Sequence, residues 1–280
     1  MADPVPPTQR EYWNSKVGEE WARQAERTDR MFAGLTDATL DALALQPGER
    51  VLDIGCGAGD TTLKAARQVG ARGRAAGVDI SRPLLELARE RARAEGLAVD
   101  FIEADAGTAP IDGAPFDAAV SRFGVMFFDD PKAAFARIRE TFRPGGRMAF
   151  ICWRTLAENL WSSAPIEALA PLLPGPLPPA DPNVPGPMSL AETTKIRTVL
   201  AGAGWRDLSI APWDGDIIMG GDAEEAAAYL MKIGPCARAI AEHKLDAAAA
   251  KKLIVRRLEQ ALGPAGVSLA AACWIVRATA

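Results

Sequence analysis

The chain has 280 residues, of which 49% are hydrophobic and 24% charged, so it can form one large α/β domain with additions or two small domains. Its formal net charge is -4 and it contains no basic run, which disfavours a nucleic-acid partner. Because its apolar runs fall short of the ~20 residues of a membrane span and its first residues are polar and proline-rich, unlike a secretory signal, we expect a cytoplasmic protein without membrane insertion.

The first 46 residues are predicted to be helical. Trp13, Val17 and Trp21 recur at four-residue spacing, as on one face of a helix, and a second amphipathic stretch follows. The turn at 46–49, Gln-Pro-Gly-Glu, ends this part. We expect residues 1–46 to form a helical lid over the domain that follows.

Short β-type runs alternate with helical segments from Val51 onward, which is typical of a parallel sheet with crossover helices. We predict that residues 47–153 form this α/β core. The predicted strands are 50–54, 74–78, 99–103, 116–121 and 147–152, and the predicted helices are 59–69, 83–95 and 131–142.

The rest of the chain begins with a proline-rich segment. Residues 171–187 contain eight prolines, too many for a helix or a central strand, so an irregular cover is predicted over 154–188. Ser189 and Glu192 have the spacing of a capping box for a helix to about residue 203. Residues 189–280 are predicted to complete the α/β domain, with a strand at 205–211, a helical insertion near 222–262 and an apolar run at 271–276.

Cysteine and histidine are sparse. Cys56, Cys152, Cys236 and Cys273 are scattered without a C-x-x-C pair, and His243 is the one histidine. We therefore predict free, buried thiols and no metal site.

The most informative segment is 51–60, an apolar strand that runs into alternating glycines and then a helix. Gly55, Gly57 and Gly59 let the chain turn tightly and let a ligand lie against N–H groups at the helix N-terminus. The spacing is G-x-G-x-G, not the dinucleotide G-x-G-x-x-G, and Asp53 stands two residues before the first glycine. A pyrophosphate would be repelled by that carboxylate, whereas the ammonium and sulfonium of S-adenosylmethionine would be attracted.

Two further acids follow the next two strands. Asp79 ends the second predicted strand, 20 residues after Gly59, where a carboxylate can accept both ribose hydroxyls. Asp105 and Ala106 follow the third strand, where a carboxylate and the next backbone N–H could read the adenine edge. Acids at three successive strand ends converge on one crevice, the place where open α/β sheets bind ligands.

These motifs resemble the class I S-adenosylmethionine-dependent methyltransferases, in the branch similar to ubiquinone/menaquinone C-methyltransferases and related small-molecule enzymes. The resemblance covers residues 47–153 and includes 116–121 and 142–146, which are similar to the family's fourth strand and the turn before its fifth. It implies a Rossmann-like α/β fold: a mostly parallel seven-stranded sheet with helices on both faces and a reversed last strand.

The resemblance also implies a cofactor, S-adenosyl-L-methionine, its product S-adenosyl-L-homocysteine, and a small-molecule methyl acceptor as partner. In the family the glycine loop holds the methionine moiety of the cofactor. The acid after the second strand binds the ribose, and the pair of residues after the third strand binds the adenine. The end of the fourth strand borders the methyl group that is transferred. The cofactor contacts so implied are Asp53, Gly55, Cys56, Gly57, Gly59, Asp79, Ile80, Asp105, Ala106, Ser121 and Arg122.

Residues outside these motifs are less specific. Trp13 and Trp21 are lid candidates, although a structural tryptophan on an amphipathic helix is the commoner case. The run 123–128 follows the fourth strand, so part of it should line the acceptor cavity while the rest packs. The substrate contacts expected from these positions are Trp13, Phe123, Phe127 and Trp153.

The sequence leaves catalytic residues open. Methyl transfer from a sulfonium is an in-line displacement in a dry pocket, and an amine or an enolate-like carbon can attack without a general base. Because no histidine comes directly after the fourth strand, carbon and nitrogen acceptors are favoured slightly over oxygen, although Asp129, Asp130 or His243 could serve as a base. The acceptor is expected to be hydrophobic or aromatic.

Two other classes of function share the expected fold. A NAD(P)-dependent oxidoreductase should show G-x-G-x-x-G and a base at the hydride site, and neither is evident in the sequence. A non-catalytic cofactor-binding protein could keep the same glycine loop, and the sequence does not separate it from an enzyme.

Overall fold

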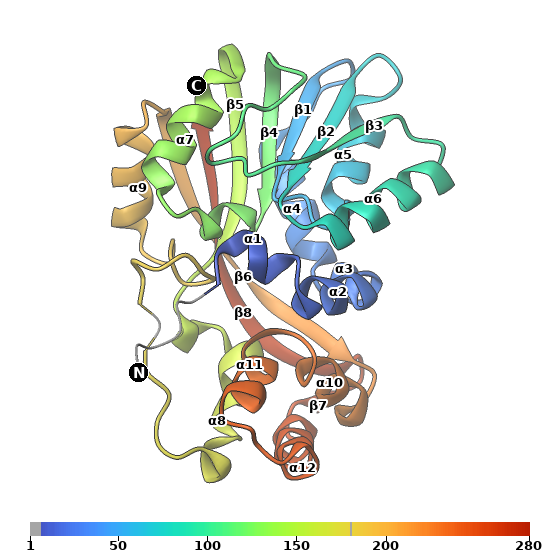
Figure 1. The fold of residues 1–280 in the computed structure, drawn as a ribbon, viewed down its shortest axis with the longest axis vertical. Helices are drawn as coiled ribbons and strands as arrows, with labels where there is room; N and C mark the ends of the chain where they lie inside the picture. The colour runs from blue at the N-terminus through green and yellow to red at the C-terminus, as the bar shows by residue number, and fades with distance from the viewer. Residues whose placement is uncertain (1–6, 180) are drawn as a thin grey trace.

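The computed structural model describes residues 7–179 and 181–280, and its centre is one twisted sheet (Figure 1). The strand order is β3-β2-β1-β4-β5-β8-β6, with the short β7 paired to β8. The strands are β1 (Arg50–Ile54), β2 (Arg74–Asp79), β3 (Val99–Glu103), β4 (Phe116–Arg122), β5 (Phe142–Trp153), β6 (Arg206–Gly220), β7 (Leu262–Gly263) and β8 (Gly266–Thr279).

The strands run in the directions that the family resemblance implies. β1 to β5 pair in parallel, whereas β8 runs antiparallel to both β5 and β6. This confirms a mostly parallel Rossmann-like sheet with a reversed last strand. The predicted count of seven omits only β7, a two-residue strand that forms a hairpin with the start of β8.

Helices cover both faces of this sheet (Figure 1). Leu40 and Leu43 on one helix and Ala65 and Val69 on the next cluster with Val51 and other small residues of one sheet face. The opposite face belongs to the larger core. The longer helices are α1 (Gln9–Trp13), α2 (Lys16–Arg23), α3 (Ala25–Met31), α4 (Ala33–Leu43), α5 (Asp60–Val69), α6 (Arg82–Ala94), α7 (Pro131–Glu140), α8 (Leu160–Glu167), α9 (Thr193–Gly202), α10 (Ala223–Leu230), α11 (Gly234–Glu242) and α12 (Ala247–Glu259).

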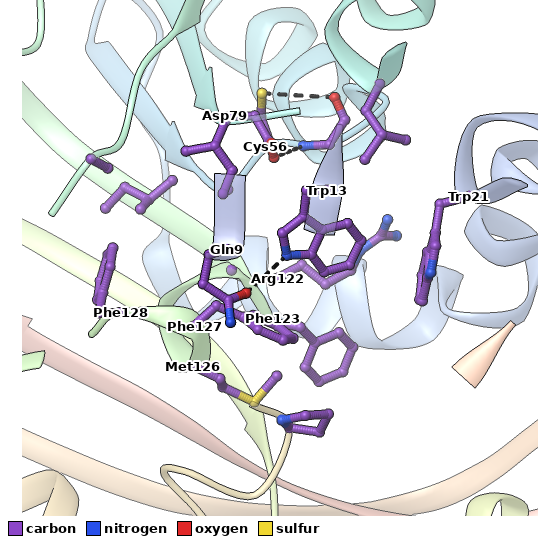
Figure 2. Close-up of a pocket in the computed structure, with 18 of the residues that line it drawn as sticks. Gln9, Trp13, Trp21, Cys56, Asp79, Arg122, Phe123, Met126, Phe127 and Phe128 are labelled. Atoms are coloured by element: carbon purple, nitrogen blue, oxygen red, sulfur yellow. Dashed lines mark hydrogen bonds between the residues drawn. The ribbon is translucent and has the colours of Figure 1, made fainter. Parts of the chain in front are cut away.

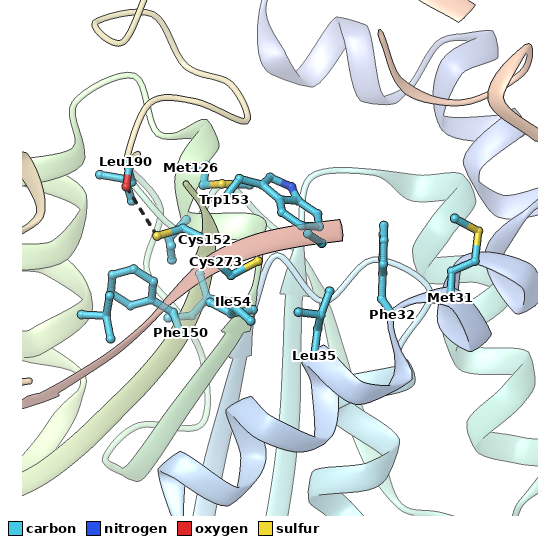
Figure 3. Packing of buried hydrophobic residues seen from close by; sticks show 14 of the residues in the cluster. Met31, Phe32, Leu35, Ile54, Met126, Phe150, Cys152, Trp153, Leu190 and Cys273 are labelled. Atoms are coloured by element: carbon cyan, nitrogen blue, oxygen red, sulfur yellow. Dashed lines mark hydrogen bonds between the residues drawn. The ribbon is translucent and has the colours of Figure 1, made fainter. Parts of the chain in front are cut away.

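The larger core joins the N-terminal helices to the strand ends (Figure 3). Phe32 and Leu35, from the start of α4, pack in one cluster with Ile54 at the end of β1 and Trp153 at the end of β5. Burial of such side chains contributes about 1.5–3 kcal/mol each. The N-terminal helices are therefore fixed to the same edge of the sheet where the predicted ligand crevice lies.

The predicted strand lengths are wrong in the second half of the chain. β6 and β8 run on past the core as a long two-stranded ribbon, paired from Arg206↔Thr279 to Gly220↔Val267, where only 205–211 and 271–276 were expected (Figure 1). In β6 exposed residues alternate with less exposed ones, so its hydrophobic signal fades although the backbone pairing with β8 continues.

The predicted helical insertion near 222–262 consists of three helices, α10, α11 and α12, of which α11 and α12 pack against α8. One further local prediction is wrong. The capping box is absent: Glu192 precedes α9 without a side-chain cap, and Ser189 Oγ instead donates to the carbonyl of Met126 at 2.6 Å. A tertiary hydrogen bond has replaced the local one.

Within the described ranges, no helix combines the length and apolar character needed to cross a bilayer. All four cysteines are free and buried, as predicted from their spacing.

Candidate active site

A cavity of about 480 Å³ lies at the carboxyl ends of β1, β2 and β4, beneath α1 and the neighbouring N-terminal helices (Figure 2). This volume falls within the range of small-molecule sites. Its walls come from distant parts of the chain, including the glycine loop, the segment after β4, and the residues Asn159, Pro187 and Pro235.

The glycine loop after β1 has the backbone that only glycine adopts readily. Gly55, Gly57 and Gly59 have φ of 68°, 52° and 87°. A Cβ on Gly55 would lie 2.6 Å from the Cα of Gly124, so the loops after β1 and β4 touch backbone to backbone. A Cβ on Gly57 would meet only Leu84 Cδ1, at 3.9 Å, so this glycine faces open space. The loop thus presents backbone to the cavity, as a tightly fitted ligand would require.

Asp79 and Asp105 line the cavity from the ends of β2 and β3. The Asp79 carboxylate accepts from the backbone N–H groups of Gly57 and Ser81, both at 2.8 Å. Burial raises the pKa of Asp79, while these backbone hydrogen bonds act to lower it. Asp105 accepts from the N–H of Gly107 at 2.8 Å. Backbone donors therefore fix both carboxylates at the cavity edge.

Asp53, Gly59 and Ser121 lie behind the cavity rather than on its wall. Ser121 Oγ donates to the carbonyl of Ile54 at 2.6 Å, which joins β4 to β1 below the glycine loop. Gly59 caps α5 and lies tightly against Ala88. Their contact with the cofactor stays a prediction, since these three residues are absent from the cavity wall.

Asp53 is buried to 1% exposure and accepts from Thr62 Oγ1 at 2.6 Å. Its other oxygen, Oδ1, is buried with no partner among the described residues. Burial raises the pKa of Asp53 to about 7, opposed by the Thr62 hydrogen bond and the Arg122 charge.

Arg122 ends β4 and lines the cavity with Phe123. Its guanidinium donates to Thr36, Asp60 and Asp29 at 2.8, 3.1 and 2.9 Å. Asp29 comes from α3 and also lines the cavity. The end of β4 therefore brings a charged residue, Arg122, and an aromatic residue, Phe123, to the cavity.

Four aromatic side chains form a continuous wall beyond Arg122, which we name the aromatic wall: Phe32, Phe123, Trp153 and Trp161. Phe123 and Trp153 stack with centroids 4.1 Å apart and planes at 12°. Phe32 meets the other three edge-on at 5.7 Å. Phe123 has a φ of 68°, a strained backbone for an aromatic residue, and the Trp153 stack helps to hold it there.

A second aromatic group comes from the N-terminal helices (Figure 2). Trp13 contacts Trp21 and Phe127 edge-on at 5.7 and 5.6 Å. Hydrogen bonds to the β2–α6 connection fix this segment: Ser81 Oγ donates to the carbonyl of Trp13 and Asn14 donates to that of Ile80, both at 2.8 Å. Trp13, Trp21 and Phe127 all reach the cavity.

Comparison with known proteins agrees with this geometry. Residues 51–146 match the family model described as a methyltransferase domain. The chain carries a class I methyltransferase domain. It is 36% identical over 110 residues to 2-phytyl-1,4-naphtoquinone methyltransferase of Synechococcus elongatus, covering 39% of this chain and 47% of that relative. It is 39% identical over 104 residues to aklanonic acid methyltransferase of a Streptomyces species, covering 37% and 47%. The chain thus spans about half the length of these relatives.

Solved structures with a similar fold cover nearly the whole chain, including the parts outside the methyltransferase domain. Phosphoethanolamine N-methyltransferase 2 of Haemonchus contortus, solved with S-adenosylhomocysteine, gives a TM-score of 0.61 at 18% identity, covering 99% of this chain and 61% of that one. The [4+2]-cyclase SpnF gives 0.56 at 22% identity, covering 99% and 97%. These likenesses show the fold alone, and the second shows that the fold also hosts other chemistry.

The structure places most of the predicted contacts of the methyltransferase domain together. Of the residues expected to bind the cofactor, those on the cavity wall are Gly55, Cys56, Gly57, Asp79, Ile80, Asp105, Ala106 and Arg122, and the expected substrate contacts Trp13, Phe123, Phe127 and Trp153 also line it. Asp129 and Asp130 lie at the same cavity. His243 ends α11 at the surface and is not on the wall, so it is not placed to act as the base.

Sequence reasoning missed Asp29, Phe32 and Asn159. Asp29 and Phe32 lie in the segment that was predicted as a helical lid, but helical periodicity does not tell a cavity-facing side chain from a core one. Asn159 is buried and donates to the carbonyl of Ala272 on β8 at 3.0 Å, which only the folded chain brings near. No local signal marks these residues.

Among the residues that the structure describes, no three His, Cys, Asp or Glu side chains gather as a metal site would need. Metal independence stays a prediction, to be tested by activity in the presence of a chelator.

Proposed function

We propose that this protein transfers a methyl group from S-adenosylmethionine to a small molecule. The observation that carries this proposal is the order of the wall along the sheet. Asp105 follows β3, Asp79 ends β2, residues 55–59 follow β1, Arg122 ends β4 and Trp153 ends β5, and these strands are neighbours in that order. This order along the sheet suits the adenine, the ribose and the amino acid end of S-adenosylmethionine, followed by the methyl acceptor.

The residues fit the cofactor in charge as well as in order. The carboxylates of Asp79 and Asp105 suit ribose hydroxyls and an adenine amine, and the bare backbone at Gly57 leaves room for the ligand. The unpartnered Oδ1 of Asp53 lies under the loop that would carry the ammonium. When bound, S-adenosylmethionine supplies a methyl group on a positively charged sulfur, with S-adenosylhomocysteine as the product.

The chain's own contribution to methyl transfer is positioning and exclusion of water. The cofactor is held by the glycine loop, Asp79 and Asp105, and the methyl acceptor is held by the segment 123–128. Trp13, packed against Phe127, covers both. In this proposal residues 1–46 act as the lid, 47–153 as the cofactor-binding core, 154–188 as a cover and 189–280 as the rest of the α/β domain with its helical insertion.

The acceptor we propose is hydrophobic or aromatic, because the cavity is lined by the aromatic wall and Phe127, and Phe123 and Trp153 of that wall come from β4 and β5, on the far side of β1 from Asp105. Two relatives are named for a naphthoquinone and for aklanonic acid, which are small molecules. Carbon and nitrogen nucleophiles are favoured over oxygen, since they need no strong base. A small-molecule acceptor, rather than a nucleic acid, also accords with the net charge of -4.

Titration calorimetry with S-adenosylmethionine, S-adenosylhomocysteine and NAD tests the cofactor, and turnover against a panel of aromatic acceptors tests the reaction. We expect micromolar affinity for both adenosyl ligands, about -8 kcal/mol, and weaker binding of NAD. A tenfold preference for NAD would reinstate an oxidoreductase. Tight cofactor binding with no methyl transfer to any acceptor would favour a protein of the same fold that does not methylate.

A further inference from the structure

The first turn of α8 brings a buried serine to the cavity. Ser162 lines the cavity next to Trp161, the member of the aromatic wall that precedes it in the chain. Only 7% of Ser162 is exposed. Its backbone N–H donates to the carbonyl of Asn159 at 3.0 Å, but its hydroxyl makes no hydrogen bond to any residue that the structure describes. A polar group therefore lies on the cavity wall without a protein partner.

Asn159 fixes the position of this turn. Its side-chain nitrogen donates to the carbonyl of Ala272 on β8 at 3.0 Å, and its side-chain oxygen accepts from the N–H of Ala272 at 2.9 Å. The same oxygen accepts from Trp161 Nε1 at 3.3 Å, and the Asn159 carbonyl accepts from the N–H groups of Ser162 and Ser163, both at 3.0 Å. Trp161 and Ser162 are thus held by one residue that is anchored to the sheet, as a binding site requires.

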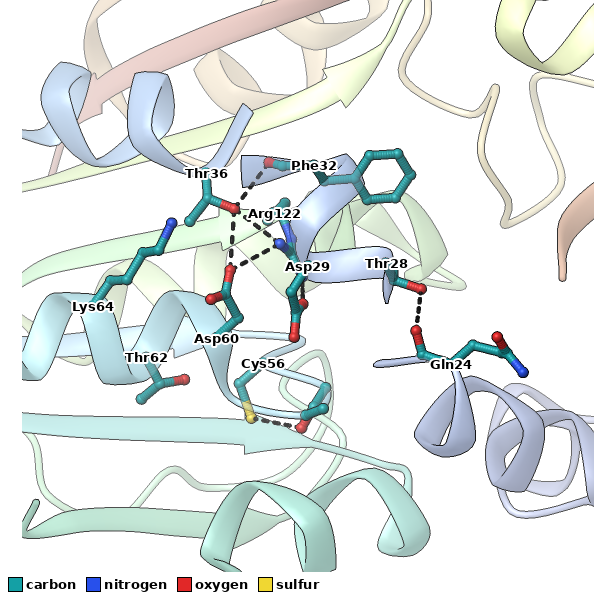
Figure 4. Close-up of polar contacts among 12 residues, drawn as sticks. Gln24, Thr28, Asp29, Phe32, Thr36, Cys56, Asp60, Thr62, Lys64 and Arg122 are labelled. Carbon is teal, nitrogen blue, oxygen red and sulfur yellow. Dashed lines mark hydrogen bonds and ion pairs between the residues drawn. The ribbon is translucent and has the colours of Figure 1, made fainter. Parts of the chain in front are cut away.

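The polar side chains that α3 and the end of β4 bring to the cavity are paired within the protein (Figure 4). Arg122 donates to Asp29 at 2.9 Å. Thr28 Oγ1 donates to the carbonyl of Gln24 at 3.0 Å and lies 2.9 Å from the hydroxyl of Tyr229. A ligand would have to compete with these partners, whereas the hydroxyl of Ser162 can bond to it directly.

A buried hydroxyl without a partner is unfavourable, so its place on the wall depends on what fills the cavity. A purely hydrocarbon ligand would exclude water from Ser162 and leave the hydroxyl unpaired. A ligand with an oxygen at this point would pair with it, because a serine hydroxyl both donates and accepts. Among aromatic ligands, Ser162 therefore selects those that carry an oxygen.

We infer that Ser162 is a specificity-determining residue for the methyl acceptor, and that this acceptor is an aromatic molecule bearing a ketone or hydroxyl oxygen. The inference rests on the proposed function, since it names the class of acceptor for the same site. The acceptor oxygen bonds to Ser162 Oγ while its rings pack against the aromatic wall. This bond orients the acceptor and takes no part in the transfer itself.

The test uses protein loaded with S-adenosylhomocysteine and two pairs of bicyclic probes, with affinities measured by ligand-observed NMR. 1-Tetralone carries a ketone that tetralin lacks, and 2-naphthol carries a hydroxyl that naphthalene lacks. In Ser162→Ala we expect the affinity for 1-tetralone, for 2-naphthol or for both to fall about 3- to 10-fold, as for a lost neutral hydrogen bond. The affinities for tetralin and naphthalene should stay within about twofold. The probe that responds identifies the kind of oxygen.

Ser163→Ala is the matched control. Ser163 is the next residue of α8, is 5% exposed and has a buried hydroxyl without a partner among the described residues, but it is absent from the cavity wall. Its replacement should change none of the four affinities.

Three results would overturn the role of Ser162 while leaving the cofactor assignment intact. They are an equal loss for oxygenated and hydrocarbon probes in Ser162→Ala, the same losses in Ser163→Ala, and a wild type that binds S-adenosylhomocysteine but binds the oxygenated probes no better than Ser162→Ala does. A wild type that does not bind S-adenosylhomocysteine would instead contradict the proposed function.

Discussion

The two ends of the cavity are built in different ways. The half that we propose for the cofactor, residues 51–106, is continuous in sequence, and its main groups are backbone atoms and the carboxylates that they hold. The half that we propose for the acceptor, the aromatic wall with Phe127, is assembled from side chains at positions 32 to 161. One half therefore depends on loop geometry, and the other on how distant segments pack.

This difference predicts different responses to substitution. In the cofactor half a single methyl group or charge should disturb binding and stability strongly, because backbone atoms have no room to adjust. In the acceptor half a shortened side chain should alter one substrate contact while the cofactor still binds. The following experiments test that contrast, from the largest expected effect to the smallest.

Asp53→Asn should show a pH-dependent gain in stability. Burial raises the pKa of Asp53 from its ordinary 3.8 to about 7, so the folded state holds this proton more tightly than the unfolded chain. The unfolding free energy of the wild type therefore falls as pH rises from about 4 to 7, by on the order of 4 kcal/mol. The variant lacks this loss. Urea unfolding should find it more stable than the wild type at pH 8 and similar at pH 4, and a constant difference would contradict the assignment.

Gly55→Ala should reduce stability by about 3 kcal/mol, because its Cβ would lie 2.6 Å from the Cα of Gly124 at a φ of 68°. Gly57→Ala is the control. It has a similar φ of 52° but a first contact at 3.9 Å, and should reduce stability by about 1 kcal/mol. Chemical denaturation measures both. Equal losses of stability would show that the positive φ, rather than the contact between the two loops, is the reason that glycine is required at position 55.

Asp79→Ala should weaken S-adenosylhomocysteine binding by about 2 kcal/mol, roughly 30-fold. The ribose would lose its acceptor, and the N–H groups of Gly57 and Ser81 would lose theirs. Calorimetry measures the change, with adenine alone as the comparison ligand. Unaltered affinity for S-adenosylhomocysteine would remove Asp79 from the cofactor site.

Phe127→Ala should raise the acceptor KM or lower kcat by about fivefold, near 1 kcal/mol, through loss of one aromatic contact. Cofactor affinity should stay within about twofold, because Phe127 belongs to the segment after β4, whereas the proposed nucleoside contacts follow β2 and β3. Steady-state kinetics with a methylated acceptor gives the first quantity and calorimetry the second. A larger effect on the cofactor than on the acceptor would erase the distinction between the two halves.

The sequence by itself determined the α/β core and the strand ends that meet at the cavity. The strands at 50–54 and 99–103 match β1 and β3 residue for residue, and Asp79 and Asp105 lie where the strand ends placed them. This succeeded because glycine spacing, strand ends and hydrophobic alternation are local signals, expressed within a few residues.

Only the tertiary structure decided the rest. The extension of β6 and β8 depends on pairing between strands some sixty residues apart, and the partners of Asp29 and Trp161 come from other elements. Asp53, which the sequence associated with the glycine loop, is buried and absent from the cavity wall. Contacts between distant segments depend on packing and burial, which leave no periodic pattern in the residues that make them.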